Sequence, residues 1–329
     1  MINPMKSSLR SLGRALACLV LVSIASSFAA ETAAPKKKVL FFSKSSGFEH
    51  DAIKTYGEPK FGYAFPVLKA LGAENNIEFT FSKDGSLFTP EYLAQFDAYF
   101  FYTTGDLTKM KSDPRGDSNP PMTPAGKAAL LQAVANGKGF LGIHSATDSF
   151  HSFGRNAHVP ERFLDDGDQA DDYVKMIGGE FIRHGAQQKS RLITADAKFP
   201  GMAAMPADWA PIEEWYSLKN FAPDLHVLLV QDTAGMKGAE YQRPPYPSTW
   251  VRMHGKGRVF YTSLGHRDDI WNHPAVRSLL AGALNWSLRR VDADITPNLA
   301  KVAPQANVLP AYEAPPPPKA APAGKSAKK

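Results

Sequence analysis

The sequence predicts an α/β fold with a mostly parallel central sheet and helices on both faces. Two observations support this prediction. Between residues 39 and 290, short apolar runs typical of buried strands alternate with helix-like segments, as in strand–helix–strand units. Two helix-like segments also begin with a Thr–Pro pair, at Thr89 and Thr123, where threonine suits the N-cap and proline the first helical position.

The predicted elements follow one another along a single domain at 38–290, because neither an internal repeat nor a second core is evident. Strands are predicted at 38–43, 77–84, 97–104, 139–145, 190–196, 226–232, 248–255 and 257–265. Helices are predicted at 62–75, with a break near Pro66, and at 89–96, 123–137, 171–178 and 273–288.

Both ends of the chain differ from this domain in composition. Residues 1–30 combine three basic residues, an apolar run and small residues, which is the pattern of a cleaved secretory signal peptide. The sequence therefore predicts a periplasmic or secreted protein without a stable membrane span once the leader is removed; an uncleaved anchor is the alternative. Residues 296–329 are rich in Pro, Ala and Lys, and we predict a disordered tail.

Composition also excludes several classes of protein. Cys18 is the only cysteine, so the chain after the leader cannot use disulfides, Cys–His catalysis or thiolate metal ligands. The formal net charge of +6 comes from the two ends, because residues 39–295 hold 27 Lys/Arg and 30 Asp/Glu. Without clustered positive charge on the domain, no nucleic-acid partner is expected.

Polar residues follow several predicted strands at the point where each strand ends. His50 follows the first strand, Asp106 the third, His144 the fourth and His266 the last, and Asp148 comes four residues after His144. Ligands of parallel sheets bind beyond the carboxyl ends of the strands. One histidine at a strand end is usually structural, but three at one edge indicate a functional site.

Several motifs between Lys38 and Leu288 are characteristic. They are "GKGFLGIHSATDSF", "YVKMIGGEFIRHG", "EEWYSL", "TWVRMHGKGRVFYTSLGH" and "LNWSL". Together they resemble the ThuA-like (trehalose-utilisation) family of the class I glutamine amidotransferase-like superfamily. The resemblance implies a flavodoxin-like three-layer αβα sandwich.

The resemblance also bears on the segment "GIHSA". Amidotransferases of this superfamily carry a nucleophilic cysteine on a tight strand-to-helix turn, and His144 stands at that position, while His266 resembles their histidine near the last strand. Imidazole is a poor substitute for a thiolate in acyl transfer, so glutamine hydrolysis is not expected. Ser145 lies one residue off the tip of the turn, which makes a serine hydrolase a weaker alternative.

His144 could be a metal ligand, a general base or a structural relic. Imidazoles and carboxylates bind zinc, iron and nickel, so a divalent metal such as zinc is a candidate cofactor. The candidate metal ligands are His50, His184 and Glu214, and His184 and Glu214 match positions of the family. The alternatives are an ion pair of Glu214 with Arg183 or Arg258, and a helix-end hydrogen bond for His184. The catalytic set is predicted to be His144, His266 as its acid/base partner, and Asp148, which would orient one of the two imidazoles or cap the next helix.

Candidate substrate contacts are mostly aromatic: Asp106, Trp215, Tyr216, Trp250 and Trp271. Aromatic faces beside carboxylates and histidines are common in sugar sites, with core packing as the alternative for Trp250 and Trp271. Two polar segments, 113–124 and 151–172, are predicted to be loops at the same edge, and the second is a candidate lid.

The functional hypothesis is an exported carbohydrate-active protein that processes a sugar or keto-sugar, with metal-dependent hydrolysis, isomerisation or lyase chemistry. The partner is then a small-molecule carbohydrate. The alternative is a non-catalytic sugar-binding or structural protein built on the same fold.

Overall fold

The computed structural model describes residues 35–56, 60–153 and 159–314, and Lys36 begins one compact unit. The signal peptide expected at 1–30 lies outside the described residues. Within the described part of the chain, no helix combines the length and the apolar character that crossing a membrane requires.

The central sheet has eight strands, in the order β4-β1-β5-β6-β14-β13-β12-β9. Their bounds are β4 (Ile77–Ser82), β1 (Lys37–Phe42), β5 (Ala98–Phe101), β6 (Gly139–Ile143), β14 (Gly257–Thr262), β13 (Tyr246–His254), β12 (His226–Gln231) and β9 (Leu192–Thr194). The first five are parallel, and each later neighbour pairs antiparallel. In sequence order the parallel strands lie 2-1-3-4-5, which is the flavodoxin-like arrangement. The predicted fold class is therefore confirmed.

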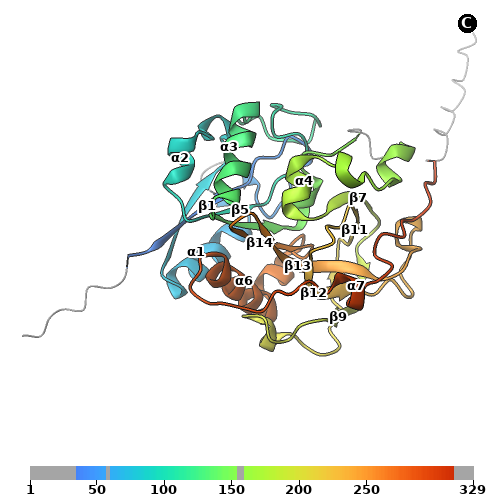
Figure 1. Ribbon diagram of the computed structural model, residues 1–329. Coiled ribbons are helices and arrows are strands. Elements are labelled where there is room, and N and C mark those ends of the chain that lie inside the picture. Colours follow the sequence, from blue (N-terminus) through green and yellow to red (C-terminus); the bar gives the residue numbers. More distant parts are fainter. Residues whose placement is uncertain (1–34, 57–59, 154–158, 315–329) are drawn as a thin grey trace, which may run out of the picture. The chain divides into compact units, whose positions relative to one another are not determined.

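Helices cover both faces of this sheet (Figure 1). Their bounds are α1 (Ala64–Glu74), α2 (Pro90–Ala94), α3 (Pro124–Ala135), α4 (Asp172–Ile177), α5 (Asp268–Asn272), α6 (Pro274–Ser287) and α7 (Leu299–Val302). Alternate residues of β1 point to opposite faces: Val39 and Phe41 pack with α1 and α6, whereas Leu40 and Phe42 pack with α2, α3 and α4. Burial on both faces explains why β1 reads as a continuous apolar run.

Local sequence signals fixed several helix ends. Thr89 accepts a hydrogen bond from the backbone of Tyr92, and Thr123 from that of Gly126, as N-caps do. The break expected near Pro66 is absent, because Pro66 falls in the first turn of α1, where a backbone N–H has no helical partner to lose.

Three small antiparallel pairs lie outside the central sheet: β7 (Glu180–His184) with β11 (Tyr216–Lys219), β8 (Gln188–Lys189) with β10 (Ile212–Glu213), and β2 (Thr55–Tyr56) with β3 (Lys60–Phe61). The sequence analysis did not predict β7 and β11. Six 3₁₀ turns complete the described elements: η1 (Gly85–Leu87), η2 (His144–Asp148), η3 (Pro160–Phe163), η4 (Gly167–Gln169), η5 (Met202–Ala204) and η6 (Ala239–Tyr241).

The prediction of a disordered tail from residue 296 is wrong for residues 296–314. Leu299 and Ala306 are buried against the α3/α4 side of the core, and the buried Arg243 donates a hydrogen bond to the carbonyl oxygen of Ala306. Asn298 pairs with both backbone groups of Val227. A few apolar residues spaced among prolines thus suffice for docking when the partner surface is preformed. Residues 315–329 lie outside the described part.

Candidate functional site

The site begins at the turn between β6 and η2. His144 has a backbone φ of +47°, in the left-handed region that a side chain with a Cβ seldom adopts. Its imidazole is fully buried, and Nδ1 lies 3.0 Å from the carbonyl oxygen of Ser263, at the end of β14. A carbonyl oxygen only accepts, so Nδ1 carries the proton and Nε2 presents a lone pair. Tyr261 donates to the carbonyl oxygen of His144 at 2.7 Å and helps to hold this turn.

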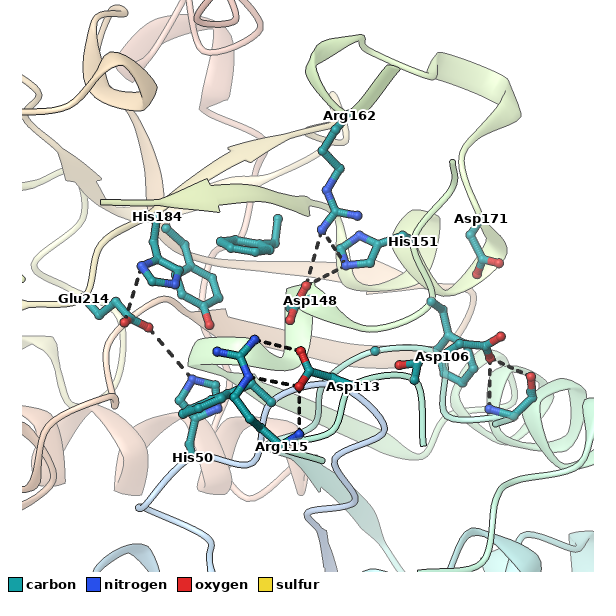
Figure 2. A pocket seen from close by; sticks show the side chains of 18 of the residues that line it. His50, Asp106, Asp113, Arg115, Asp148, His151, Arg162, Asp171, His184 and Glu214 are labelled. Carbon is teal, nitrogen blue, oxygen red and sulfur yellow. Dashed lines mark hydrogen bonds and ion pairs between the residues drawn. The ribbon is translucent and has the colours of Figure 1, made fainter. Parts of the chain in front are cut away.

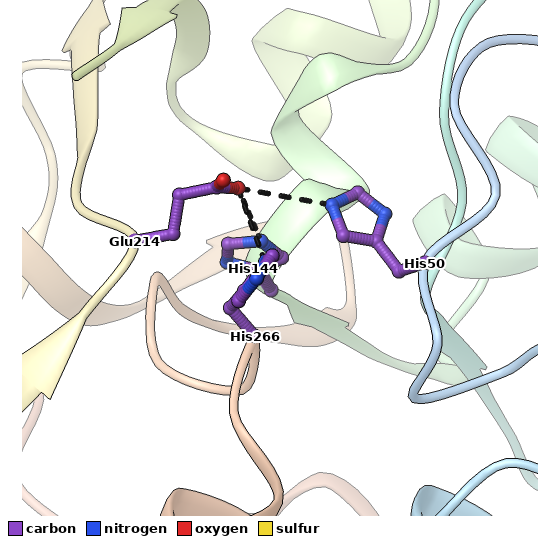
Figure 3. A group of neighbouring side chains, drawn as sticks. All are labelled: His50, His144, Glu214 and His266. Carbon is purple, nitrogen blue, oxygen red and sulfur yellow. Dashed lines mark ion pairs between the residues drawn. The ribbon is translucent and has the colours of Figure 1, made fainter. Parts of the chain in front are cut away.

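Three imidazoles from three strand exits converge on one carboxylate (Figure 3). The Oε2 atom of Glu214 lies 3.1 Å from Nδ1 of His266, 3.4 Å from Nε2 of His144 and 3.9 Å from Nε2 of His50. We call these four residues the His/Glu cluster. Sequence analysis expected His50, His144 and His266 to meet at the carboxyl edge of the sheet, and the structure brings them together there.

Other side chains hold the loops that carry these residues. Glu213 accepts the N–H of Gly265 at 3.0 Å and so ties the β10–β11 connection to the loop of His266. Trp271 and Tyr102 both donate to the carbonyl oxygen of Gly265. Because the backbone N–H and the carbonyl of Gly265 are both hydrogen-bonded, this loop holds the adjacent His266 in place.

Burial and the shared carboxylate set the charge of the cluster. Desolvation lowers the pKa of His50, and lowers that of His144 to about 3, so both are neutral at pH 7. Burial opposes a charge on His266 as well, but the adjacent carboxylate of Glu214 outweighs this and raises the pKa of His266. Burial disfavours ionised Glu214, yet the three imidazoles that surround this carboxylate hold its pKa well below the usual range.

The donor set fits a divalent transition metal. Four ligands at about 2.0–2.2 Å from a tetrahedral ion lie about 3.3–3.6 Å apart, close to the separations around Glu214. The four donor atoms all lie within 4.8 Å of one another. Among the described residues, Nε2 of His144 and Nδ1 of His266 are buried without a hydrogen-bond partner. The His/Glu cluster could therefore hold a metal ion through three nitrogens and one oxygen.

His184 does not belong to this set of four atoms, although sequence analysis placed it among the ligands. Its Nδ1 lies 3.4 Å from the other oxygen of Glu214, and its side chain is half-exposed at the end of β7. The alternative ion pairs of Glu214 are also wrong, because Arg183 pairs with Glu240 and Arg258 with Asp292.

The cluster opens into a cavity of about 760 Å³, within the usual range for small-molecule sites (Figure 2). Four cavity-lining carboxylates bond to neighbouring groups: Asp113 to Arg115, Asp171 to Lys127, Asp148 to Arg162, and Asp106 to Thr108. Aromatic rings complete the wall, namely Phe48, Phe150, Phe181 and Tyr216. The cavity is thus lined by paired charges and aromatic faces.

Two of the predicted contacts line this cavity, Asp106 and Tyr216, but the three tryptophans do not. Trp215, Trp250 and Trp271 are fully buried in the core, and each indole N–H donates to a backbone carbonyl. Their expected role in stacking on substrate is wrong, because burial leaves none of their faces free. Phe181 lines the cavity instead; it lies on β7, which sequence analysis did not predict.

Asp148 lines the cavity, but its partner is neither His144 nor His266. Its Oδ1 lies 2.6 Å from Nε2 of His151, whose Nδ1 lies 3.0 Å from Oε1 of Glu180. Sequence analysis missed His151, Arg162 and Glu180. The one signal for His151 was its position three residues after Asp148 in "HSATDSFHSF".

Fold and site together define an α/β protein with a buried His/Glu cluster, suited to a metal ion, at the carboxyl edge of a parallel sheet. The sequence matches the ThuA family, described as trehalose utilisation, over residues 38–287, so the chain belongs to this family. A search of curated proteins found no match.

Three solved structures are similar to this chain. A ThuA-like protein from Bacteroides uniformis is 22% identical, with a TM-score of 0.54 over 79% of this chain and 94% of that one. A ThuA-like protein from Parabacteroides merdae is 18% identical, with a TM-score of 0.48 over 84% and 98%. A β-galactosidase from Bacillus circulans sp. alkalophilus is 12% identical, with a TM-score of 0.44 over 76% of this chain and 31% of that one. The first likeness supports the fold.

Proposed function

We propose that this protein is an exported, metal-dependent enzyme that acts on a small carbohydrate. The observation that carries the proposal is the convergence of three imidazoles and one carboxylate next to a ligand-sized cavity. The leader composition supports export to the periplasm or the medium. Membership of a family described as trehalose utilisation supports a sugar, and a disaccharide first.

The protein's own groups would bind and orient the sugar. Tyr216 and Phe181 offer ring faces to the apolar side of a pyranose, and the paired carboxylates of the wall offer acceptors to its hydroxyl groups. Because three of these carboxylates are paired with basic side chains, those of Asp113, Asp148 and Asp171, the wall suits a neutral polyol better than a strongly charged ligand.

The His/Glu cluster would hold the ion through His50, His144, Glu214 and His266. A bound divalent ion supplies Lewis acidity toward a sugar oxygen or water. The contact of Nδ1 of His144 with Ser263 keeps Nε2 unprotonated, which prepares it as a ligand without a proton to displace. Neutral His50 needs no deprotonation either.

The test is elemental analysis of the purified protein, followed by a screen of trehalose, other disaccharides and their oxidised keto forms. We expect about one zinc, iron or nickel ion per chain, and turnover of at least one sugar that chelation abolishes. His226→Ala is the matched control, because His226 is a buried histidine at the opposite edge of the sheet. Tight sugar binding without turnover would instead support a binding protein. A protein that neither binds metal nor any of the sugars contradicts the proposal.

A further inference from the structure

A second polar cluster lies on the wall of the same cavity and is centred on His151 (Figure 2). Aromatic rings connect it to the His/Glu cluster: the ring of Phe181 lies 6.5 Å from that of His151 and 4.1 Å from that of Tyr216, which in turn lies 4.3 Å from that of His144. A ligand in the cavity can therefore face both clusters.

The Nδ1 atom of His151 carries a proton. It lies 3.0 Å from Oε1 of Glu180, which is fully buried. Burial opposes the charge of Glu180, but hydrogen bonds from His151 and Ser152 outweigh it and lower its pKa to about 2. The amide of Asn220 also donates to Glu180 at 2.7 Å. An ionised carboxylate only accepts, so the imidazole must donate to it.

The Nε2 atom of His151 faces one acceptor and one donor. Oδ1 of Asp148 lies 2.6 Å away, and Nη2 of Arg162 lies 2.7 Å away. The short contact with Asp148 requires one proton between the two atoms, on either Nε2 or Oδ1. If that proton leaves, Arg162 can donate to both acceptors, because its Nη2 also lies 3.4 Å from Oδ1 of Asp148.

Both protonation states of this pair thus have hydrogen-bond partners. The pair can give up one proton to a neighbouring group and take it back without leaving an isolated buried charge. Asp148 and His151 both line the cavity, so a bound ligand can reach them.

We propose that Asp148 and His151 are the proton donor and acceptor of this site, with Glu180 and Arg162 as positioning residues. The proposal rests on the proposed function. In the step, the shared proton moves from the pair to the leaving oxygen of the sugar, so that an O–H bond forms there while the bond from that oxygen to its carbon breaks. A water molecule then adds its OH group to that carbon and returns its other proton to the pair. A donor of this kind contributes about 10²–10⁴-fold to a rate.

The charged groups around His151 come from several elements. Asp148 belongs to η2, Arg162 to η3 and Glu180 to β7, while Lys219 on β11 and Asp166 lie behind them and pair with each other. Of these groups, Asp148, His151 and Arg162 line the cavity.

The first test is an NMR titration of the zinc-loaded protein from pH 5 to pH 9, by long-range ¹H–¹⁵N correlation of the imidazoles. His151→Gln assigns the signals. We expect Nδ1 of His151 to stay protonated, and one further proton to be shared between Nε2 and the carboxylate of Asp148, seen as ¹⁵N and carboxyl ¹³C shifts intermediate between the protonated and unprotonated forms. If both nitrogens of His151 stay protonated throughout, the residue forms a fixed ion pair with Asp148. If Nε2 stays unprotonated throughout, no proton is shared. Either result overturns the proposal.

The second test uses kinetics on a sugar that the screen shows to be turned over. Asp148→Asn should lower kcat by about 100-fold or more, change KM by less than about 3-fold, remove one limb of the pH profile of kcat, and leave zinc content unchanged. The matched control is His226→Gln, since His226 forms a similar pair with Asp196, 3.0 Å away and far from the cavity. Equal losses in both variants, or a loss of zinc in Asp148→Asn, contradict the proposal. If the protein binds zinc but turns over none of the sugars, the proposed function is contradicted. The NMR experiment then still tests whether Asp148 and His151 share a proton.

Discussion

The imidazole of His144 and the carbonyl oxygen of Ser263 are joined by a hydrogen bond of 3.0 Å between the ends of two neighbouring strands, β6 and β14. This bond fixes the tautomer of His144, and the left-handed backbone at His144 aims Nε2 at Glu214. Metal binding, rather than folding, should therefore depend on this side chain.

We predict that His144→Ala lowers metal affinity by more than about 100-fold, because removal of a direct ligand should cost more than loss of a group that only orients one. The fold should persist. Circular dichroism would check the fold, and a metal titration would check the affinity. His226→Ala should behave in the opposite way. His226 bonds to Thr296 and Asp196, so its loss should cost about 1–3 kcal/mol of stability with unchanged metal affinity. A variant of His144 that still binds zinc as tightly as the parent contradicts the ligand assignment.

Zinc should raise the melting temperature of the metal-free protein. A ligand at 100 times its Kd stabilises the native state by about 2.7 kcal/mol, which corresponds to roughly 5–10 °C for a domain of this size. Glu214→Gln should abolish most of this shift, since the amide is a weaker ligand. Differential scanning calorimetry with and without zinc measures it. An equal shift in parent and variant would place the metal elsewhere.

Glu180 should make stability depend on pH. Its folded pKa of about 2 lies below the ordinary value of 4.5, so its contribution is present above about pH 5 and disappears as the pH falls toward 2. We expect Glu180→Gln to cost on the order of 3 kcal/mol at pH 7 and progressively less in acid. Urea unfolding at pH 7, 5 and 3 provides the comparison; a difference between parent and variant that does not shrink with acid is the contrary result.

Truncation should separate the two parts of the C-terminal segment. A stop after residue 314 leaves every described contact in place and should not change the melting temperature. A stop after residue 295 removes the burial of Leu299 and one of the acceptors of Arg243, a buried cation whose pKa burial lowers to about 10. We expect this loss to cost about 2–4 kcal/mol, seen as a lower urea midpoint. Equal stability of both truncated proteins would show that the docked segment is dispensable.

The sequence by itself determined the sheet and the edge of the sheet at which the site lies. Strands buried on both faces read as apolar runs, and the Thr–Pro helix starts act through local hydrogen bonds, so both are visible without tertiary information. Because parallel strands end at one edge, the positions of His50, His144 and His266 after three such strands were enough to predict their convergence.

Only the tertiary structure decided the partners of each side chain. Trp250 and Phe181 are both aromatic, yet Trp250 on β13 is sealed in the core, whereas Phe181 faces the cavity from the short antiparallel pair β7–β11. Asp148 lies four residues after His144 and three before His151 along the chain, and in the structure it pairs with His151. Such pairings depend on the direction of a side chain at a turn. That direction is set by the packing of distant segments, which leaves no periodic pattern in the sequence.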